Sequence, residues 1–144
     1  MNLPSKRINM ENVTEQEQRN MDTILSLVNN FNAGRTDILD DLVHDDFKNH
    51  HAQEGLQDKA GFYEIVKTIS ATFSTMEGFK VTPIHLFAKG DMVAMMDVGE
   101  GTKNGRAYRH KDIHIFRMKD GKMYEHWNSF GLPCQKDMLM KFME

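Results

Sequence analysis

Hydrophobic residues recur at helical spacing through the first half of the chain. Thr14 and Glu17 form a capping-box pattern just before the first apolar stripe, and a glycine follows its end. This pattern predicts a helix over 14–34. Shorter stripes with the same spacing predict two further helices, over 36–43 and 58–73.

The second half of the chain changes to strand patterns separated by turn signals. β-favouring runs occupy 79–88 and 92–102, and Pro83 indicates an edge or bulge position in the first of them. A hairpin over 110–130 completes a four-strand antiparallel meander. This order predicts an α+β fold in which a curved sheet wraps the helices, enclosing a cavity wherever they leave space. Two short segments complete the pattern: an extended piece over 47–51 and a C-terminal helix over 135–142.

The last hairpin concentrates the polar chemistry of the chain, and Asp120-Gly121 is its turn. With a two-residue loop, His126 points away from His114. With a three-residue loop, in which Gly121 is a bulge residue, His114 falls opposite His126. A shift of one residue moves a whole strand's side chains to the other face, and the pattern alone does not choose. The second register gathers His110, Asp112, His114, Phe116, Tyr124, His126, Asn128 and Phe130 on one face, and Ile113, Ile115, Arg117, Met123, Glu125 and Trp127 on the other.

Composition narrows the class of protein. The 144 residues suit a single domain, predicted over 14–144 after a flexible arm over 1–13. A net charge of −3 without a basic run argues against a nucleic-acid partner. No segment approaches the roughly 20 apolar residues of a membrane helix, so no membrane association is expected. The single cysteine and the absence of an apolar leader predict a cytoplasmic protein.

Several segments in this order resemble the SnoaL-like polyketide cyclase branch of the nuclear transport factor 2-like superfamily. They are N-A-G-R-T-D-I-L-D-D-L-V-H-D-D-F-K-N-H (32–50), A-K-G-D-M-V-A (88–94) and I-F-R-M-K-D-G-K-M-Y-E-H-W-N (115–128), together with Gly55 and G-T (101–102). The resemblance implies a cone of three N-terminal helices wrapped by a curved, mainly antiparallel sheet that encloses an apolar pocket. Members include cyclases that perform intramolecular aldol chemistry, isomerases and inert binding modules, so fold alone does not fix function.

The resemblance also bears on the hairpin. In isomerase-like members a pocket acid lies three residues before the arginine of F-R, and that position is His114 here. Alternate residues of the last strand line the pocket in the same relatives, which supports the three-residue loop. The isomerase base matches Asn49, and the aspartate that usually follows E-H-W is Asn128. Ketosteroid isomerisation is therefore not expected, and the cyclase acid/base chemistry cannot be carried over directly.

Histidine and aspartate on one strand face suit proton transfer beside a carbonyl. Such a reaction needs a base that removes the proton and donors that steady the enolate oxygen. Histidine is a suitable base at neutral pH. We predict that His114 or His126 is the base and that Asp112 orients it. His50, the fourth catalytic candidate, is expected to face the cluster from across the pocket and to help place the substrate. The predicted substrate-binding residues are Asn128, Asn49, Phe116, Phe130, Met96 and His110.

The expected partners are a small apolar molecule and a second copy of the chain, because the opposite sheet face often forms a dimer interface in this superfamily. No cofactor is expected. Three alternatives stay open: a non-catalytic binding module, a dimerisation module with a filled pocket, and a metal site. The metal site would use His110, Asp112, His114 and His126.

Overall fold

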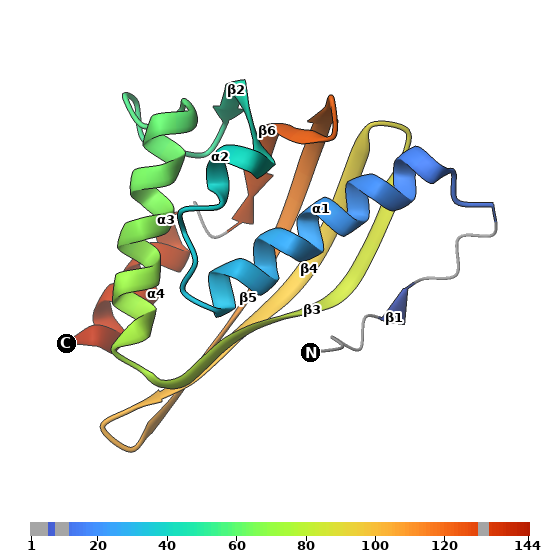
Figure 1. The fold of residues 1–144 in the computed structure, drawn as a ribbon. Helices are drawn as coiled ribbons and strands as arrows, with labels where there is room; N and C mark the ends of the chain where they lie inside the picture. Colours follow the sequence, from blue (N-terminus) through green and yellow to red (C-terminus); the bar gives the residue numbers. More distant parts are fainter. Residues whose placement is uncertain (1–5, 8–11, 130–132) are drawn as a thin grey trace.

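A computed structural model describes residues 6–7, 12–129 and 133–144. In this part of the chain, one sheet of six strands has the order β1-β3-β4-β5-β6-β2 (Figure 1). The strands from β3 to β6 form the predicted antiparallel meander, while β1 runs parallel to β3 and β2 parallel to β6. The strands are β1 (Lys6–Arg7), β2 (Val43–Asn49), β3 (Glu77–Lys89), β4 (Met92–Lys103), β5 (Arg106–Lys119) and β6 (Lys122–Asn128).

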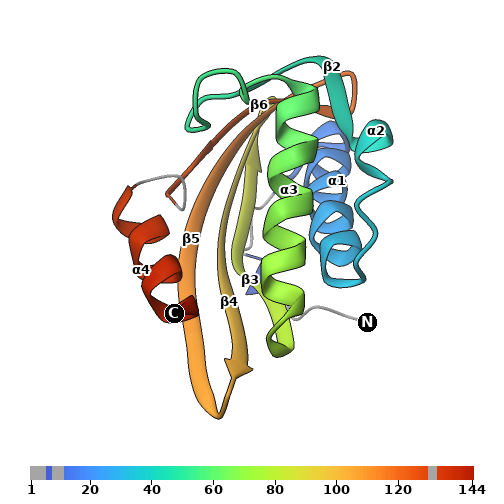
Figure 2. The same cartoon turned by 90° about the vertical axis from the view of Figure 1, so that its left-hand side faces the viewer.

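Two long helices, α1 and α3, lie on the same side of the curved sheet (Figures 1 and 2). The predicted capping box starts α1: Glu17 N–H donates to Thr14 Oγ1, and Thr14 N–H donates to Glu17 Oε1. Among the described residues, no helix is long and apolar enough to cross a membrane. The helices are α1 (Glu15–Asn32), α2 (Leu39–Leu42), α3 (Lys59–Ser74) and α4 (Pro133–Met143). The predicted α+β fold is confirmed.

The largest departure from the predicted elements is at β2. Val43, placed in the second helix from its spacing, is instead the first residue of β2 and pairs with Met123 of β6. Both side chains are buried in the core, so tertiary packing overrides the local helical pattern. The predicted irregularity at Pro83 is confirmed, because the β3–β4 register shifts between Pro83 and His85.

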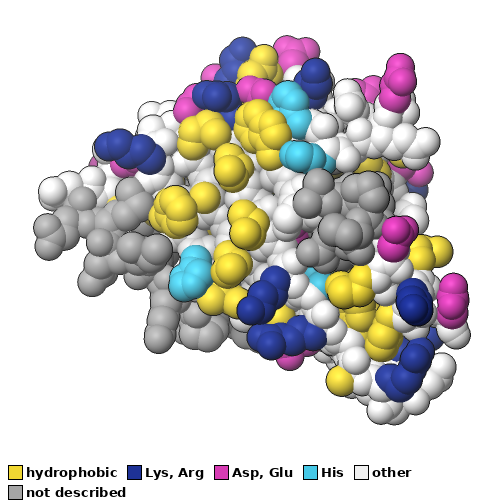
Figure 3. All heavy atoms as spheres, turned by 180° about the vertical axis from the view of Figure 1, so that it is seen from behind, with side chains coloured by type: hydrophobic (Ala, Val, Ile, Leu, Met, Phe, Trp, Pro, Cys, Tyr) yellow, Lys and Arg dark blue, Asp and Glu magenta, His cyan; other side chains and the backbone are white. Residues whose placement is uncertain are grey.

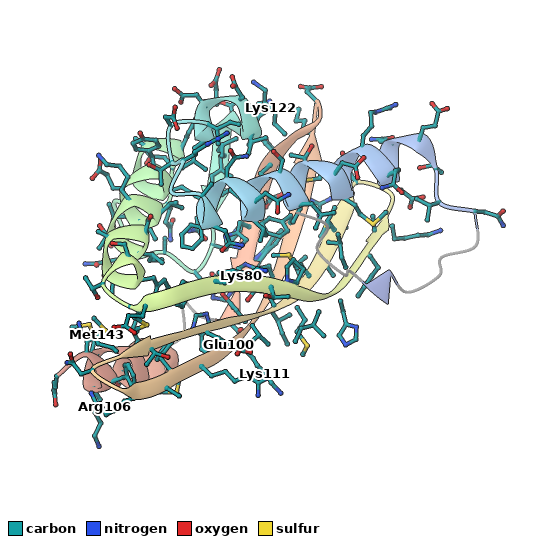
Figure 4. All side chains as sticks on the ribbon, turned by 60° about the horizontal axis from the view of Figure 1, so that its bottom comes forward. Lys80, Glu100, Arg106, Lys111, Lys122 and Met143 are labelled. Atoms are coloured by element: carbon teal, nitrogen blue, oxygen red, sulfur yellow. The ribbon has the colours of Figure 1, made fainter. Side chains whose placement is uncertain are left out.

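The core fills the space between the helices and the concave face of the sheet. A large cluster joins residues of α1, β2 and α3 to β3–β6, with Ile24 of α1 and Phe116 of β5 both fully buried. A smaller cluster at the far end of the sheet brings together Phe73 of α3, Tyr108 of β5 and Leu139 of α4. Arg106 holds α4 there by donating to the Phe142 carbonyl at 2.8 Å (Figure 4).

The last hairpin combines parts of both predicted registers. The three-residue loop was wrong: Lys119 pairs with Lys122, and Asp120 and Gly121 both have positive φ, as in a two-residue type I′ turn. Beyond the turn, Met118 pairs with Met123 whereas Arg117 pairs with Glu125. Tyr124 is therefore the extra residue of a β-bulge.

The bulge restores the predicted shared face by a different route. An extra residue reverses the alternation of side chains, so His126 and Asn128 return to the face that carries His114. His114 pairs with Asn128 and not with His126, and Phe116 is the residue opposite His126. Met123, on the turn side of the bulge, is fully buried, so its predicted outward position was wrong.

Candidate active site

His114 is the centre of a buried hydrogen-bonded network on the concave face of the sheet. Its Nε2 lies 3.0 Å from Asp97 Oδ2 and 3.1 Å from Asp112 Oδ2. Its Nδ1 lies 2.9 Å from Nε2 of His126. The network crosses three neighbouring strands, because Asp97 is in β4, Asp112 and His114 are in β5, and His126 is in β6. We call these four residues the acid–histidine network.

Strand pairing explains why the two carboxylates meet. Asp97 and Asp112 are directly opposite each other in the β4–β5 ladder, and both are buried. Like charges in this position repel, and burial strengthens the repulsion. A proton on His114 Nε2 lies between the two carboxylates and offsets it.

At neutral pH His114 is positively charged and His126 is neutral. Burial lowers the pKa of His114, but hydrogen bonds and charge from Asp112 and Asp97 outweigh burial and raise it to about 9. Burial and the neighbouring His114 charge hold the pKa of His126 well below its ordinary value. His114 is therefore an imidazolium, and its Nδ1–H donates to Nε2 of neutral His126. The remaining proton of His126 is on Nδ1.

Hydrogen bonding distinguishes the two carboxylates. Besides His114, Asp112 accepts from Ser129 Oγ at 2.7 Å and from Asn128 Nδ2 at 3.3 Å. Asp97 accepts from His114 through Oδ2, while its Oδ1 is buried without a hydrogen-bond partner among the described residues. His126 Nδ1 is also buried without one. The network thus has an unpaired acceptor at one end, Asp97 Oδ1, and an unpaired donor at the other end, His126 Nδ1–H.

Aromatic rings hold the histidines in place. The rings of His114, Phe116 and His126 are close to parallel, with centroid separations of 4.7–5.6 Å. Phe62 of α3 covers His126 from the helix side, with a centroid separation of 5.8 Å. These contacts restrict the rotation of both imidazoles and so favour the observed hydrogen bonds.

A second buried histidine, His110, lies further along the same face of β5. Its Nδ1 is 2.8 Å from the Tyr108 hydroxyl, and its ring stacks on Phe73. Burial lowers the pKa of His110, so the ring is neutral at pH 7. Gly99 of β4 makes room for it, because a Cβ there would lie 2.4 Å from the His110 ring. The structure thus places His110 within an aromatic cluster at the end of the network.

Sequence reasoning missed Asp97. It lies in a run that was assigned only to a strand, and no motif marks it. Alternation along β4 would have placed Asp97 on the same face as Val93 and Met95, but the register between β4 and β5 was needed to bring it opposite Asp112.

The other predicted site residues divide between the two faces of the sheet. Asn49 and Phe116 are neighbours of His126 on the concave face, and Asn49 Oδ1 is buried with no partner among the described residues. Phe130 lies outside the described residues. The expected position of Met96 was wrong: it pairs with Ile113 on the convex face, and Met95 takes the inward position opposite His114.

The expected position of His50 was also wrong. It follows the inward-facing Asn49 by one residue, so the alternation of β2 directs it to the convex face. There its Nε2 lies 2.7 Å from Glu125 Oε2, and its ring stacks on Trp127 at 4.4 Å. Glu125 also accepts from Arg117 Nε at 2.9 Å. His50 thus belongs to a separate polar group.

A cleft of about 510 Å³ lies between α2, β2 and the start of α3. Its walls include buried Leu39, Val43 and Phe62, and charged residues such as Lys59 lie at its rim. None of the nine predicted site residues that the structure describes is among the residues that line this cleft. The enclosed pocket expected beside the hairpin therefore remains a prediction.

The spacing of the network would also suit a metal ion. Ligand atoms of Asp97, Asp112 and His114 lie within 4.8 Å of one another, the one such group found among the described residues. Metal binding requires a neutral histidine ligand, whereas His114 Nε2–H already donates to both carboxylates. A metal ion would have to displace the Nε2 proton of His114. The geometry is therefore that of a hydrogen-bonded network and not that of a metal site.

Comparison with known proteins places the fold and the hairpin in a family. The model of the SnoaL-like domain family matches residues 24–126, which is most of the chain. The chain belongs to the SnoaL-like domain family. Nogalonic acid methyl ester cyclase from Streptomyces nogalater is 29% identical over 117 residues, covering 72% of this chain and 86% of that protein.

Solved structures of other proteins agree with the fold. A proposed polyketide cyclase from Bacillus cereus superposes with a TM-score of 0.69 and 21% identity, covering 88% of this chain and 86% of that one. TsrD from Streptomyces laurentii gives a TM-score of 0.66 and 18% identity, covering 82% and 90%. At these identities the superpositions establish the fold, and the chemistry of this SnoaL-like chain has to be argued from its own site.

Proposed function

We propose that this SnoaL-like protein is an enzyme that performs acid/base catalysis of the aldol-cyclase type on a small, largely apolar carbonyl compound. The observation that carries the proposal is the acid–histidine network. It holds a buried imidazolium between two carboxylates and leaves one acceptor and one donor unpaired. Buried polar atoms without partners are costly, and their presence on one face is typical of a site that awaits a ligand.

Family membership supports the same class of reaction. The curated relative is named as a cyclase of nogalonic acid methyl ester, and we propose a substrate of the same chemical kind for this chain. Aldol ring closure moves a proton from carbon to oxygen within one molecule. It therefore needs a base, a donor and a dry cavity, and no redox partner.

The direct test is turnover of nogalonic acid methyl ester by the purified protein. We expect cyclisation by the wild type and a loss of at least about 100-fold in kcat for His126→Ala, because acid/base and donor groups typically contribute factors of that size. His85→Ala is the matched control, since His85 is an exposed histidine on β3. Circular dichroism would establish that both variants are folded at the assay temperature.

The outcomes separate the alternatives. Binding of the ester without turnover, measured by calorimetry, would replace the enzyme by a non-catalytic binding module. Neither binding nor turnover would favour a dimerisation module and end the cyclase proposal for this substrate. A His126→Ala variant as fast as His85→Ala would remove the network from the mechanism.

We also propose that the convex face of the sheet binds a second copy of the chain. Large apolar side chains are exposed there, namely Ile113 at 52%, Ile115 at 41% and Phe87 at 41%. Figure 3 displays hydrophobic side chains gathered over this face. The Trp127–His50 stack and the Arg117–Glu125 pair lie on the same face, which gives the apolar patch polar neighbours.

Replacing Ile113 by aspartate is expected to shift the protein from dimer to monomer, because a carboxylate would be buried in an apolar interface. Analytical ultracentrifugation at micromolar concentration would measure the change. Met140→Asp is the control, since Met140 is an exposed residue of α4, outside the strands that carry this patch. A wild type that sediments as a monomer, or an Ile113→Asp variant that stays dimeric, would refute the interface.

A further inference from the structure

Asp97 stands out among the buried acids because only one of its two carboxylate oxygens has a partner. Oδ2 accepts from His114, while Oδ1 is buried and has none among the described residues. Asp112, opposite it, accepts from His114, Asn128 and Ser129. Asp97 Oδ1 therefore has its lone pairs available to accept a proton from a substrate.

The charge of the network also bears on this oxygen of Asp97. Two carboxylates and one imidazolium leave a net charge of −1 on the buried face. Burial disfavours uncompensated charge, so a proton arriving at the open oxygen of Asp97 neutralises the network. His114 cannot serve as the base in this state, because both of its ring nitrogens already carry protons.

At the other end of the network, His126 offers a complementary donor. It accepts from His114 through Nε2 and carries its own proton on Nδ1, which is buried without a partner among the described residues. The charge on His114 polarises the His126 ring through their hydrogen bond and so strengthens Nδ1–H as a donor. Phe62 and Phe116 pack on the same ring and exclude water from it.

We propose that Asp97 is the general base of this protein and that His126 Nδ1–H holds the enolate oxygen, with His114 as the positioning residue between them. This assignment rests on the proposed cyclase function. It differs from the sequence-based hypothesis, in which a histidine was the base and Asp112 its partner. The position after E-H-W, where relatives usually have an aspartate, holds Asn128, and its amide donates to Asp112. In this assignment Asp97 supplies the carboxylate that Asn128 cannot.

The proton and electron count closes without a co-reactant. Asp97 Oδ1 takes a proton from the carbon beside a carbonyl, and the C–H electron pair becomes the enolate whose oxygen accepts from His126. The enolate carbon then bonds to a second carbonyl carbon of the same molecule, and the π pair of that carbonyl moves to its oxygen. The alkoxide takes the proton back from Asp97. The product is an isomer of the substrate, and the enzyme is regenerated.

The test compares two carboxylates of the same network on nogalonic acid methyl ester. We expect Asp97→Asn to lower kcat by at least about 100-fold with KM changed less than threefold, since it removes a group that acts in the transition state. Asp112→Asn is the matched control and should lose at least tenfold less kcat. Asp97→Glu should recover part of the rate, because it restores a carboxylate. Thermal melts would establish that each variant is folded.

The results distinguish failure of the base assignment from failure of the function. An inactive wild type overturns the proposed function and the base together. An active wild type whose Asp97→Asn variant keeps kcat within fivefold, or loses no more than Asp112→Asn, overturns Asp97 alone. Wild-type activity that disappears with EDTA and returns with Zn²⁺ also overturns Asp97 as the base, since its carboxylate would then be a metal ligand. If Asp97→Asn does not fold, Asp97→Glu decides: partial activity supports a carboxylate base, and complete loss of activity in the folded variant overturns it.

Discussion

Replacing His114 by leucine is expected to lower the free energy of unfolding by about 3–5 kcal/mol at pH 7, the range found when one partner of a buried ion pair is removed. The substitution leaves Asp97 and Asp112 facing each other across adjacent strands without the cation that lies between them. Both carboxylates are almost completely shielded from solvent. Without this cation either the two charges repel each other or one carboxylate has to take up a proton, and both cost free energy. Urea unfolding followed by circular dichroism would measure the loss.

A second substitution distinguishes repulsion from lost packing. In the His114→Leu background, Asp97→Asn should restore at least about 1 kcal/mol, because it removes one of the two facing charges. In the wild-type background the same Asp97→Asn change should destabilise the protein, because it removes a negative charge that stabilises the His114 imidazolium. This reversal of sign is specific to charge. His85→Leu, at an exposed position, should change stability by no more than about 0.5 kcal/mol. Equal effects of Asp97→Asn in both backgrounds would contradict the charge argument.

The stability of the wild type is expected to fall as the pH rises from about 6.5 to above 9. The pKa of His114 is about 9 in the folded protein, above the ordinary histidine value of 6.5. The folded state therefore binds this proton more tightly than the unfolded state does. The stabilisation is fully present below pH 6.5 and is lost as the pH rises through 9. Its size is on the order of 3 kcal/mol, given about 1.4 kcal/mol for each pKa unit.

His126 and His110 oppose this trend on the acid side. Both have pKa values below the ordinary one, so the folded state resists their protonation. Their effect is to reduce stability as the pH falls below 6.5. Together, the contributions of these three histidines to stability are largest close to pH 6.5. Asp97 and Asp112 face His114, and their charges are the cause of its raised pKa.

Two measurements test the pH dependence. Urea midpoints from pH 6 to 10 should decline for the wild type and stay nearly flat for His114→Leu over the same interval. ¹⁵N spectra of labelled histidine should give His114 a titration midpoint near 9, with both ring nitrogens protonated at pH 7. A midpoint at or below 6.5 would mean that His114 is not the cation of the network, and the stability argument would fail with it.

Local patterns predicted the elements well where strong signals occur. The capping box at Thr14, the meander with its Asp120-Gly121 turn, and the irregularity at Pro83 all have causes within a few residues of the chain. Val43 was misplaced because its spacing fits a short helix, whereas its pairing partner in β6 lies 80 residues away. Boundaries that depend on distant partners carry no local signal.

The candidate site was predicted in part. Asp112, His114, His126 and Asn128 come from one hairpin and do lie together on the concave face. His50 and Met96 were each predicted to face the site, but both lie on the convex face. Each is one residue away from the neighbour that does face inward, and successive residues of a strand point to opposite faces. Such an error cannot be detected without the pairing of the neighbouring strand.

By itself, the sequence determined the α+β class, the order of helices and strands, and the concentration of histidine and aspartate in one hairpin, because these depend on local spacing and composition. Only the tertiary structure decided which groups meet. The bulge at Tyr124 returned His126 to the face of His114, and the β4–β5 register brought Asp97 opposite Asp112. It also decided charge, since the imidazolium of His114 exists because two strands place carboxylates around one nitrogen in a buried setting.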